Sequence, residues 1–316
     1  MRTQKRRHFE TKGSDMSDKK SVGLIGVGLM GKGIGKTLME KGYPLSVVAN
    51  KNRTHVETLV GLGASEAGSI AELAGAVDVI ITCLPNIPSV HAVFEGPGGV
   101  LENAKSGTLI IDTTTGDPEL TKKLEADARA KGILLAEAPL LGGPKMTWEG
   151  TISLAVGGAD DALAAAMPIL EDFSKARFVA GGPGAGHTLK LINNAVTLTN
   201  SAVLYEAFAV ARTKGVDLET LYGALDASMA SSKRLHAIAP NLINNDHTVT
   251  FALDTATKDL VLFSMVANQT GVPTLVADSS RALYQLCQSL GYGDKNVTEI
   301  AEALAQLGGA TFGDET

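Results

Sequence analysis

The sequence predicts an α/β protein: an N-terminal Rossmann-type doubly wound sheet, followed by an all-helical domain joined to it through a long helix. Short apolar runs alternate with helix-period segments from residue 21 to about residue 181. This alternation is typical of βαβ units and a parallel sheet. From His187 to Lys214 the chain has no Gly or Pro and keeps apolar residues at helical spacing, which predicts one helix of about 40 Å. Only helix-period segments follow it.

The individual elements follow from the same patterns. Val22–Gly26 is a short apolar run that ends in glycine, and a helix is expected at Leu29–Lys41. Val77–Leu84 is apolar throughout, as expected for a strand that is buried on both faces. Further strands are expected at Leu45–Ala49, Thr108–Ile111, Leu134–Ala136, Thr151–Val156 and Arg177–Val179. Helices are expected at Val56–Leu62, Val90–Phe94, Pro118–Lys131, Leu218–Leu225, Ile238–Ile243, Asp254–Thr270, Thr274–Leu290 and Asn296–Leu307.

Glycine and proline mark the expected domain boundary, at Gly181-Gly182-Pro183-Gly184. We therefore expect a dinucleotide-binding domain over 21–182 and an all-α substrate and oligomerisation domain over 183–308. Residues 1–20 are polar and lack the apolar stretch of a secretory signal, so a disordered tail is expected there. A short tail is expected at 309–316.

Composition excludes several classes of function. The chain has 316 residues, a net charge of −6 and 44% hydrophobic residues, which argues against a general nucleic-acid binder. No apolar window is long enough for a membrane span. The two cysteines form neither a disulfide framework nor a zinc motif, and no His/Cys/carboxylate cluster has the spacing of metal ligands. We expect a cytoplasmic protein without a metal.

A nucleotide-binding turn is expected where the first strand meets the first helix. The motif G-x-G-x-x-G is formed by Gly26, Gly28 and Gly31, with Leu29 and Met30 inside it. The first glycine permits the tight turn, the second lets the backbone approach a pyrophosphate, and the third lets the helix pack on the strand. The helix N-terminus would then face the phosphates.

The end of the second predicted strand bears on which nicotinamide cofactor binds. NAD-specific sites commonly place Asp or Glu there to hold the ribose hydroxyls. Here the segment is Asn50-Lys51-Asn52-Arg53, so no carboxylate repels a 2′-phosphate and two cations can pair with it. These charges could also belong to a solvated loop. NADP(H) is favoured, and NAD(H) remains open.

Six segments in order resemble the β-hydroxyacid dehydrogenase family over residues 21–308. They are GVGLMG (26–31), CLPN (83–86), DTTTGDP (112–118), EAPLLGG (137–143), GPGAGHTLKLINN (182–194) and KDL (258–260). The resemblance implies that Leu84 and Pro85 flank the nicotinamide ribose and that Lys258 approaches the nicotinamide. It also implies hydride transfer between a nicotinamide cofactor and a small 3-hydroxy acid or its semialdehyde, in a homodimer or homotetramer.

Lys190 is the expected general acid and base, and Asn194 is its expected partner. The two lie four residues apart, on one face of the long helix. Reduction of an aldehyde creates an alkoxide that needs a proton, and a partly desolvated Lys can supply it. His187 competes for this role, although it precedes the apolar face. An isolated helical Lys is usually solvated, so the assignment depends on the motif.

The expected substrate is a small aldehyde or hydroxy acid that carries a carboxylate. By resemblance, Thr114 and Thr115 bind that carboxylate, although a threonine here could instead cap the next helix. Thr115 is also expected beside the cofactor. Gly142 and Gly143 would offer backbone N–H groups as a small anion nest, or form a simple turn. The family usually has Ser before this glycine pair, whereas this chain has Leu141.

Several other residues have competing interpretations. Lys145 could replace the lost hydroxyl with a cation or face solvent, and Cys83 is expected to be a core residue rather than a nucleophile. Trp148 could cover the pocket or simply pack. Ser231, Ser232 and Lys233 complete the family's pocket or form a polar turn.

Two other functions fit the same fold. An imine reductase shares the architecture but usually lacks the Lys, and a non-enzymatic nucleotide-binding scaffold can keep the glycines and lose it. Lys190 argues against both. The alanine-rich stretch of the long helix, with Ala202, Ala207, Ala209 and Ala211, is expected to permit close approach of a partner subunit's helices.

Overall fold

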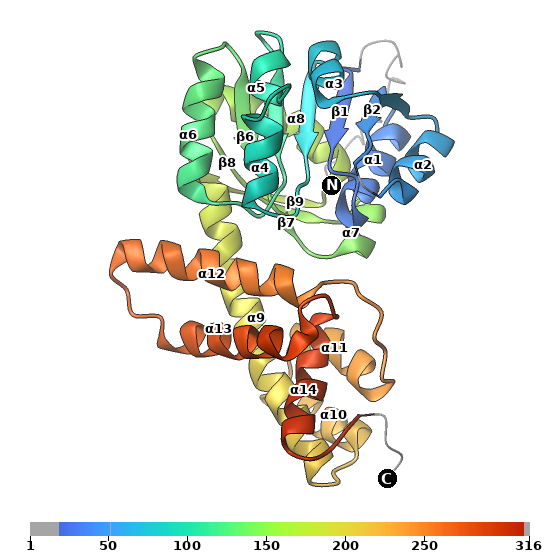
Figure 1. Ribbon diagram of the computed structural model, residues 1–316, viewed down its shortest axis with the longest axis vertical. Coiled ribbons are helices and arrows are strands. Elements are labelled where there is room, and N and C mark those ends of the chain that lie inside the picture. The colour runs from blue at the N-terminus through green and yellow to red at the C-terminus, as the bar shows by residue number, and fades with distance from the viewer. Residues whose placement is uncertain (1–18, 51, 313–316) are drawn as a thin grey trace, which may run out of the picture.

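A computed structural model describes residues 19–50 and 52–312. Figure 1 shows an N-terminal domain built around a sheet and, below it, a helical domain reached through one long helix. Residues 1–18 of the expected N-terminal tail, Lys51 and the last four residues lie outside the described part of the chain. Among the described residues no helix is long and apolar enough to cross a membrane.

The sheet has nine strands in the order β3-β2-β1-β4-β5-β6-β8-β7, with β9 paired to β8. The strands are β1 (Val22–Ile25), β2 (Leu45–Val48), β3 (Ser65–Ala67), β4 (Val79–Thr82), β5 (Leu109–Asp112), β6 (Leu134–Glu137), β7 (Leu140–Leu141), β8 (Ser153–Gly158) and β9 (Ala176–Gly181). All seven expected strands form. The pattern did not predict β3 and β7, which have three and two residues.

Helices cover both faces of this sheet, which explains why its central strands are apolar throughout. Val79, Ile81 and Ile111 point into the core cluster on one face, and Ile80 and Ile110 into the cluster on the other. The helices are α1 (Leu29–Glu40), α2 (Thr54–Gly61), α3 (Ile70–Ala76), α4 (Ile87–Phe94), α5 (Val100–Asn103), α6 (Pro118–Arg129), α7 (Pro144–Trp148) and α8 (Asp160–Phe173). Of these, α3, α5, α7 and α8 were not predicted from the sequence.

The expected doubly wound sheet forms, but it is not parallel throughout. Strands β1 to β6 are parallel, but β8 runs antiparallel to both β6 and β7. A parallel pair needs a crossover of a dozen or more residues, usually through a helix. Strand β7 continues β6 in the same direction, and both are antiparallel to β8. The chain turns back between β7 and β8, where the short α7 is the one helix, and this connection is too short to carry the chain back to the other end of the sheet.

The long helix α9 (Ala185–Thr213) links the two domains. It begins after Gly184, which has a φ of +87° and leaves no room for a Cβ against the Pro118 carbonyl oxygen. It ends before Gly215, which has a φ of +70°. One face carries Leu198, Tyr205 and Phe208 into the core of the helical domain.

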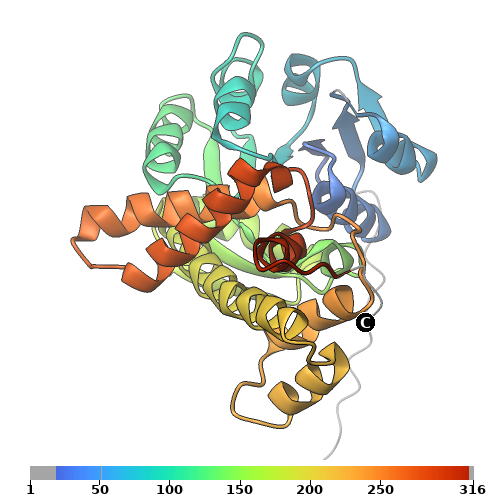
Figure 2. The same cartoon turned by 60° about the horizontal axis from the view of Figure 1, so that its bottom comes forward.

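The rest of the chain folds around α9. Its helices are α10 (Leu218–Asp226), α11 (Lys233–Ile243), α12 (Leu253–Thr270), α13 (Leu275–Cys287) and α14 (Ile300–Leu307). The helix expected from Ile238 begins five residues earlier, because the Ser232 side chain caps its first turn. Helices α12 and α13 form an antiparallel pair that projects beyond α9 (Figure 2). Helix α12 lies next to the sheet domain (Figure 1).

Candidate active site

The turn between β1 and α1 has the backbone that a dinucleotide site requires. Gly26 has a φ of +98°, and a Cβ there would lie 2.3 Å from the Cys83 carbonyl oxygen. A Cβ on Gly31 would lie 2.2 Å from the Gly26 carbonyl oxygen, whereas Gly28 faces open space. No side chain caps α1, and Leu29 is 44% exposed. The turn therefore presents an open helix N-terminus that fits a pyrophosphate.

Arg53, one of the two cations expected to read a 2′-phosphate, already has carboxylate partners. It lies 2.9 Å from Glu66 on β3 and 3.6 Å from Glu57 on α2. Asn50 is exposed at the end of β2. The structure brings Arg53 and Asn50 to the expected edge of the sheet, but an acidic residue from an unpredicted strand accompanies them.

The loops after β4 and β5 are joined to each other. The Leu84 backbone N–H donates to the Thr114 hydroxyl oxygen at 3.0 Å, and the Thr114 N–H donates to Asp112 Oδ1 at 3.0 Å. Thr114 is buried and keeps its hydroxyl proton free to donate. Neither Thr114 nor Thr115 caps α6, because Asp117 has that role. Pro85 lies in the same loop as Leu84, at the carboxyl edge of the parallel strands where ligands bind in open α/β sheets.

Lys190 lies at this edge, in the first third of α9. Its side chain is 8% exposed, and Nζ donates to the Leu140 carbonyl oxygen on β7 at 2.6 Å. Burial lowers the pKa of Lys190 to about 8; the Asp259 carboxylate opposes this change and the Lys258 ammonium adds to it. A lysine with this pKa exchanges a proton near neutral pH, as a general acid and base must.

Asn194 and Lys258 meet at a carboxylate that the sequence analysis did not single out. Asn194 Nδ2 donates to Asp259 Oδ2 at 2.6 Å, and Lys258 Nζ lies 3.0 Å from Asp259 Oδ1. Lys258 also donates to the Thr115 carbonyl oxygen at 3.0 Å. Asp259 is 2% exposed. Helix α12 therefore brings a buried anion and a second cation to the site from 65 residues away in sequence.

The glycine pair does not have the geometry of an anion nest. Gly143 is extended, with a φ of −118° and a ψ of −178°, whereas a nest alternates right- and left-handed backbone. Successive N–H groups of an extended chain point in opposite directions, so only one of the pair can face a given carboxylate. Gly142 is exposed and Leu141 half-buried. Lys145 is 86% exposed and lies 3.9 Å from Glu149, so it does not replace the missing hydroxyl.

The remaining candidates have structural partners. Burial raises the pKa of the Cys83 thiol to about 11, which leaves it unreactive near neutral pH. The ring of Trp148 lies 5.2 Å from Lys32 Nζ and 5.0 Å from Lys36 Nζ, on α1. Ser232 caps α11, and Ser231 donates to Asp226 on α10. Ser231 and Lys233 are exposed.

His187 lies in the first turn of α9, one turn before Lys190, and is 0% exposed. Its Nδ1 is 2.9 Å from Glu137 Oε2, and its Nε2 is 2.9 Å from the Thr114 carbonyl oxygen. Sequence reasoning gave Glu137 and Asp112 no functional role. Each is the last residue of an apolar strand and the first residue of one of the segments that resemble the family.

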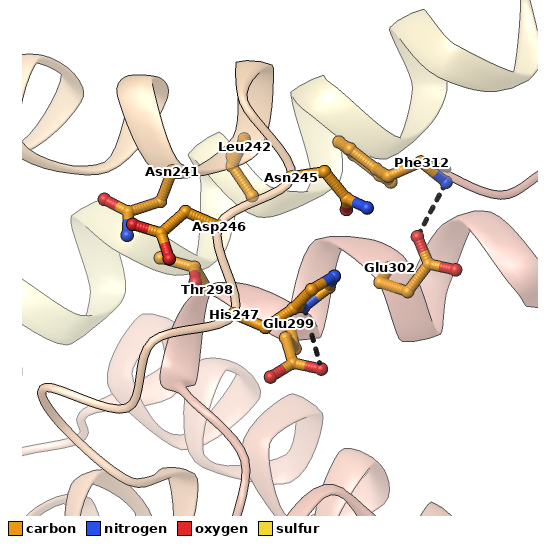
Figure 3. A pocket seen from close by; sticks show the side chains of 9 residues that line it. All are labelled: Asn241, Leu242, Asn245, Asp246, His247, Thr298, Glu299, Glu302 and Phe312. Atoms are coloured by element: carbon orange, nitrogen blue, oxygen red, sulfur yellow. Dashed lines mark hydrogen bonds and ion pairs between the residues drawn. The ribbon is translucent and has the colours of Figure 1, made fainter. Parts of the chain in front are cut away.

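A pocket elsewhere in the helical domain contains none of the predicted site residues. It is lined by Asn241, Leu242, Asn245, Asp246, His247, Thr298, Glu299, Glu302 and Phe312. Figure 3 shows His247 beside Glu299, at 3.3 Å, and the Phe312 backbone N–H bonded to Glu302. These residues come from α11, α14 and the segments beside them, whereas Lys190 contacts β7. The pocket is separate from the candidate active site.

Two family models match the chain. Residues 21–182 match the NAD-binding domain of 6-phosphogluconate dehydrogenase, and residues 184–304 match the NAD-binding family of NADP-dependent 3-hydroxyisobutyrate dehydrogenase. The 3-sulfolactaldehyde reductase of Escherichia coli is 32% identical, over 92% of this chain and 98% of the relative. The 2-(hydroxymethyl)glutarate dehydrogenase of Eubacterium barkeri is 30% identical, over 92% of this chain and 96% of the relative.

Solved structures share the fold. The 3-hydroxyisobutyrate dehydrogenase of Salmonella typhimurium superposes with a TM-score of 0.84 at 24% identity, covering 90% of this chain and 99% of that one. An imine reductase from a Pseudomonas species gives a lower TM-score of 0.59 at 20% identity, covering 91% and 100%. Together with the glycine turn, these matches place the chain in a family: it belongs to the β-hydroxyacid dehydrogenases and is a nicotinamide-dependent oxidoreductase that acts on CH–OH donors.

Proposed function

We propose that this enzyme interconverts a small 3-hydroxy acid and its semialdehyde, with Lys190 as the proton donor in reduction and the proton acceptor in oxidation. One observation carries the proposal: Lys190 is a buried ammonium at the carboxyl edge of the sheet, and burial lowers its pKa to about 8. A bound nicotinamide supplies or accepts the hydride. The protein must then donate or accept one proton at the substrate oxygen and bind the substrate's acidic group.

The proton moves at Lys190 Nζ. In reduction, Nζ–H donates to the developing alkoxide oxygen, which leaves a neutral amine; in oxidation, the neutral amine takes the hydroxyl proton back. The Leu140 carbonyl oxygen holds one Nζ–H and so orients the other two. Burial excludes water that would compete for the proton. The positive charge of Lys258 nearby favours loss of the proton to substrate.

We assign Asn194 the role of positioning the Lys190 ammonium, through Asp259. The Asp259 carboxylate accepts from the Asn194 amide and lies beside the half-buried Lys258 ammonium, so three side chains from α9 and α12 form one polar network. This network ties the helical domain to the Thr115 loop through Lys258. We assign Asn194 and Asp259 to positioning and Lys190 to proton transfer.

The substrate's acidic group is assigned to the loop after β5 and to the glycine pair. Thr114 has a hydroxyl proton free to donate, Thr115 is half-buried beside it, and Gly143 offers one N–H. Leu141 supplies an apolar wall where a Ser hydroxyl would otherwise lie. The two relatives named above act on sulfolactaldehyde and 2-(hydroxymethyl)glutarate, which supports a small acidic substrate but leaves carboxylate and sulfonate to be compared.

NADP(H) is the proposed cofactor, with phosphates at Gly26, Gly28, Leu29, Met30 and Gly31. The absence of a carboxylate at Asn50 supports the phosphorylated form. The pairing of Arg53 with Glu66 works against it, because a 2′-phosphate must compete for that guanidinium. Lys51 is therefore the residue on which the preference chiefly depends.

We also propose a homodimer or homotetramer, with a contact face that differs from the expected one. Of the four alanines expected there, Ala202, Ala209 and Ala211 are each 5% exposed and pack inside the chain, so they cannot meet a partner, and Ala207 is half-buried. The opposite face of α9 has an exposed apolar stripe with the spacing of a helix-packing seam. Its members are Ile192, Val196, Val203 and Val210, which are 47, 59, 59 and 61% exposed.

A panel of small aldehyde acids tests the function. Each is supplied with NADPH and with NADH, and oxidation of the cofactor is followed by absorbance. We expect turnover with a three- or four-carbon carboxylate or sulfonate aldehyde, and a loss of 10²–10⁴-fold in kcat for Lys190→Ala with cofactor affinity retained. A nucleotide-binding scaffold would bind cofactor and turn over nothing. Activity on cyclic imines but not on aldehyde acids would favour the imine reductase.

A further inference from the structure

Three titratable side chains form a buried cluster beneath the candidate active site, and the proton step proposed above uses none of them. Asp112 ends β5, Glu137 ends β6, and His187 lies in the first turn of α9. They are 4, 1 and 0% exposed. His187 Nδ1 lies 2.9 Å from Glu137 Oε2, and Nε2 lies 3.9 Å from Asp112 Oδ2. The cluster joins the helical domain to two strands of the sheet.

The hydrogen bonds around His187 determine its protonation. Nε2 lies 2.9 Å from the Thr114 carbonyl oxygen, which can only accept, so Nε2 carries a proton. Nδ1 lies 2.8 Å from Thr121 Oγ1. That hydroxyl donates its one proton to the Asp117 carbonyl oxygen at 3.1 Å, so it accepts from Nδ1. With the Glu137 carboxylate 2.9 Å from Nδ1 as well, this arrangement favours a proton on both ring nitrogens, that is, an imidazolium.

The electrostatics agree with this assignment. Burial lowers the pKa of His187, but the close contact with Glu137 at Nδ1 and its charge, together with the charge of Asp112, outweigh burial and raise that pKa above its ordinary value. The charged and titratable groups that face the ring are thus one carboxylate from β5 and one from β6. On the side of α6 the ring meets only the neutral Thr121 hydroxyl. Among the described residues no His/Cys/Asp/Glu group could hold a metal, so the cluster is not a metal site.

Three glycines lie against the cluster, where any side chain would collide with it. A Cβ on Gly116 would lie 3.2 Å from the His187 ring, and one on Gly157 would lie 2.2 Å from Glu137 Oε1. A Cβ on Gly186 would lie 3.0 Å from Glu137 Cγ. The Gly186 backbone N–H also donates to Glu137 Oε1 at 2.7 Å. Glu137 therefore holds both the backbone and the ring of the first turn of α9.

We propose that His187 is a positioning residue, an imidazolium that with Glu137 fixes the start of α9 and the Thr114 loop to the ends of β5 and β6. Lys190 follows His187 by three residues and so shares its face of the helix. The ring's other nitrogen holds the carbonyl of Thr114, a residue assigned to the substrate's acidic group. One charged ring thus sets the distance between the proton donor and the substrate loop. The expected effect of His187 on kcat rests on the proposed function of Lys190. The positive charge of the His187 ring does not depend on that function.

The same geometry excludes His187 as the general base. Both ring nitrogens are engaged, and the ring is 0% exposed, so it has no free lone pair and no path to substrate. The competing assignment made from the sequence is therefore not supported by the contacts of His187. Its role is to act through Lys190 and Thr114.

Histidine NMR tests the charge independently of activity. The full chain is labelled with ¹⁵N at histidine, and the His187 signals are assigned by their loss in His187→Gln. We expect both ring nitrogens to carry a proton at pH 6.5, where an ordinary histidine is half deprotonated. A His187 ring with one unprotonated nitrogen at that pH would refute the proposed imidazolium, whatever residue donates the proton in catalysis.

Kinetics test the positioning role. His187→Gln removes the charge and the ring that contacts Thr121 and Thr114 from its two nitrogens. We expect kcat per folded, cofactor-binding molecule to fall about 10- to 100-fold, since displacements of about 1 Å have effects of that size. The KM for NADPH should not change. The control is His247→Gln, which breaks the His247–Glu299 ion pair in the pocket of Figure 3 and should leave kcat unchanged.

A second pair of variants covers the case in which His187→Gln does not fold. Thr121→Ser keeps the hydroxyl that accepts from Nδ1, and Thr121→Val removes it. The proposal expects a lower kcat for Thr121→Val than for Thr121→Ser, with equal cofactor affinity. Equal kcat values for the two, or a His187 variant with wild-type kcat, would overturn the positioning role. Failure of the proposed function is distinguished by Lys190→Ala, which would then retain activity.

Discussion

Replacing Lys190 with Met should make the enzyme more stable while it abolishes most of the activity. Met is close to Lys in length and carries no charge. Lys190 is 8% exposed. Its recorded hydrogen bond runs from Nζ to the Leu140 carbonyl oxygen. The variant therefore removes a buried charge and one hydrogen bond, and it keeps the packing volume approximately.

The magnitude follows from the pKa. Burial lowers the pKa of Lys190 from 10.5 to about 8. At about 1.4 kcal/mol per pKa unit, the ammonium form costs the folded state about 3 kcal/mol at neutral pH. Loss of the hydrogen bond to Leu140 offsets about 1 kcal/mol of the stability gained by removing the charge. We therefore expect Lys190→Met to raise the free energy of unfolding by about 2 kcal/mol at pH 7.

The gain should depend on pH with a defined sign. Because the folded pKa lies below the unfolded one, the unfolded chain binds more protons between pH 8 and 10.5, and wild-type stability rises with pH across that window. The advantage of Lys190→Met is thus full below pH 8 and disappears toward pH 10.5. Urea unfolding of both proteins at pH 7 and pH 9.5 measures the difference, with kcat measured on the same samples.

The matched control is Lys145→Met, which removes a lysine that is 86% exposed. It should change neither the free energy of unfolding nor kcat. The reasoning is refuted if Lys190→Met is less stable than wild type at pH 7, because Lys190 would then be a favourable rather than a strained charge. It is equally refuted if Lys190→Met keeps wild-type kcat.

Four further outcomes are expected. The kcat for aldehyde reduction should fall as pH rises through about 8, where Lys190 loses its proton, and the kcat for oxidation should rise through the same pH; pH–rate profiles that move together would contradict this. Lys51→Ala should raise the KM for NADPH more than the KM for NADH, and equal changes would remove the charge argument. Val203→Glu should place a charge in the exposed stripe of α9 and reduce the mass seen by light scattering; an unchanged mass would locate the interface elsewhere. Gly31→Ala should weaken cofactor binding measured by fluorescence, because its Cβ would lie 2.2 Å from the Gly26 carbonyl oxygen; wild-type affinity would mean that the turn can adjust.

The parts of the fold that could be predicted from the sequence are those that local physics decides. Alternation of apolar runs with helical periods predicted seven strands, and the absence of Gly and Pro predicted α9. Helix α8 escaped this reasoning because it contains Pro168, which lacks an N–H and normally ends a helix. The direction of β8 also escaped it, because the apolar pattern of a strand is the same whether its neighbours run parallel or antiparallel.

In the candidate site, too, local spacing predicted some features, whereas others depend on tertiary packing. The spacing of Lys190 and Asn194 placed both on one helix face, and both are buried. The partner of Asn194 is Asp259, and the partners of His187 come from β6 and α6. No local pattern predicts such contacts, because they depend on how α9 packs against elements 49 to 66 residues away in sequence.

The sequence by itself determined the nucleotide turn, the family and the position of the proposed proton donor, because each depends on residue type and spacing along a few turns of chain. Only the tertiary structure decided which face of α9 is buried. It buries Ala202, Ala209 and Ala211 and leaves the stripe of Ile192, Val196, Val203 and Val210 exposed, since both faces are apolar and packing selects one of them. It also decided the charge chemistry: Lys190 titrates near pH 8 because α9 buries it against β7 and α12, and a lysine's pKa depends on its surroundings rather than on its neighbours in sequence.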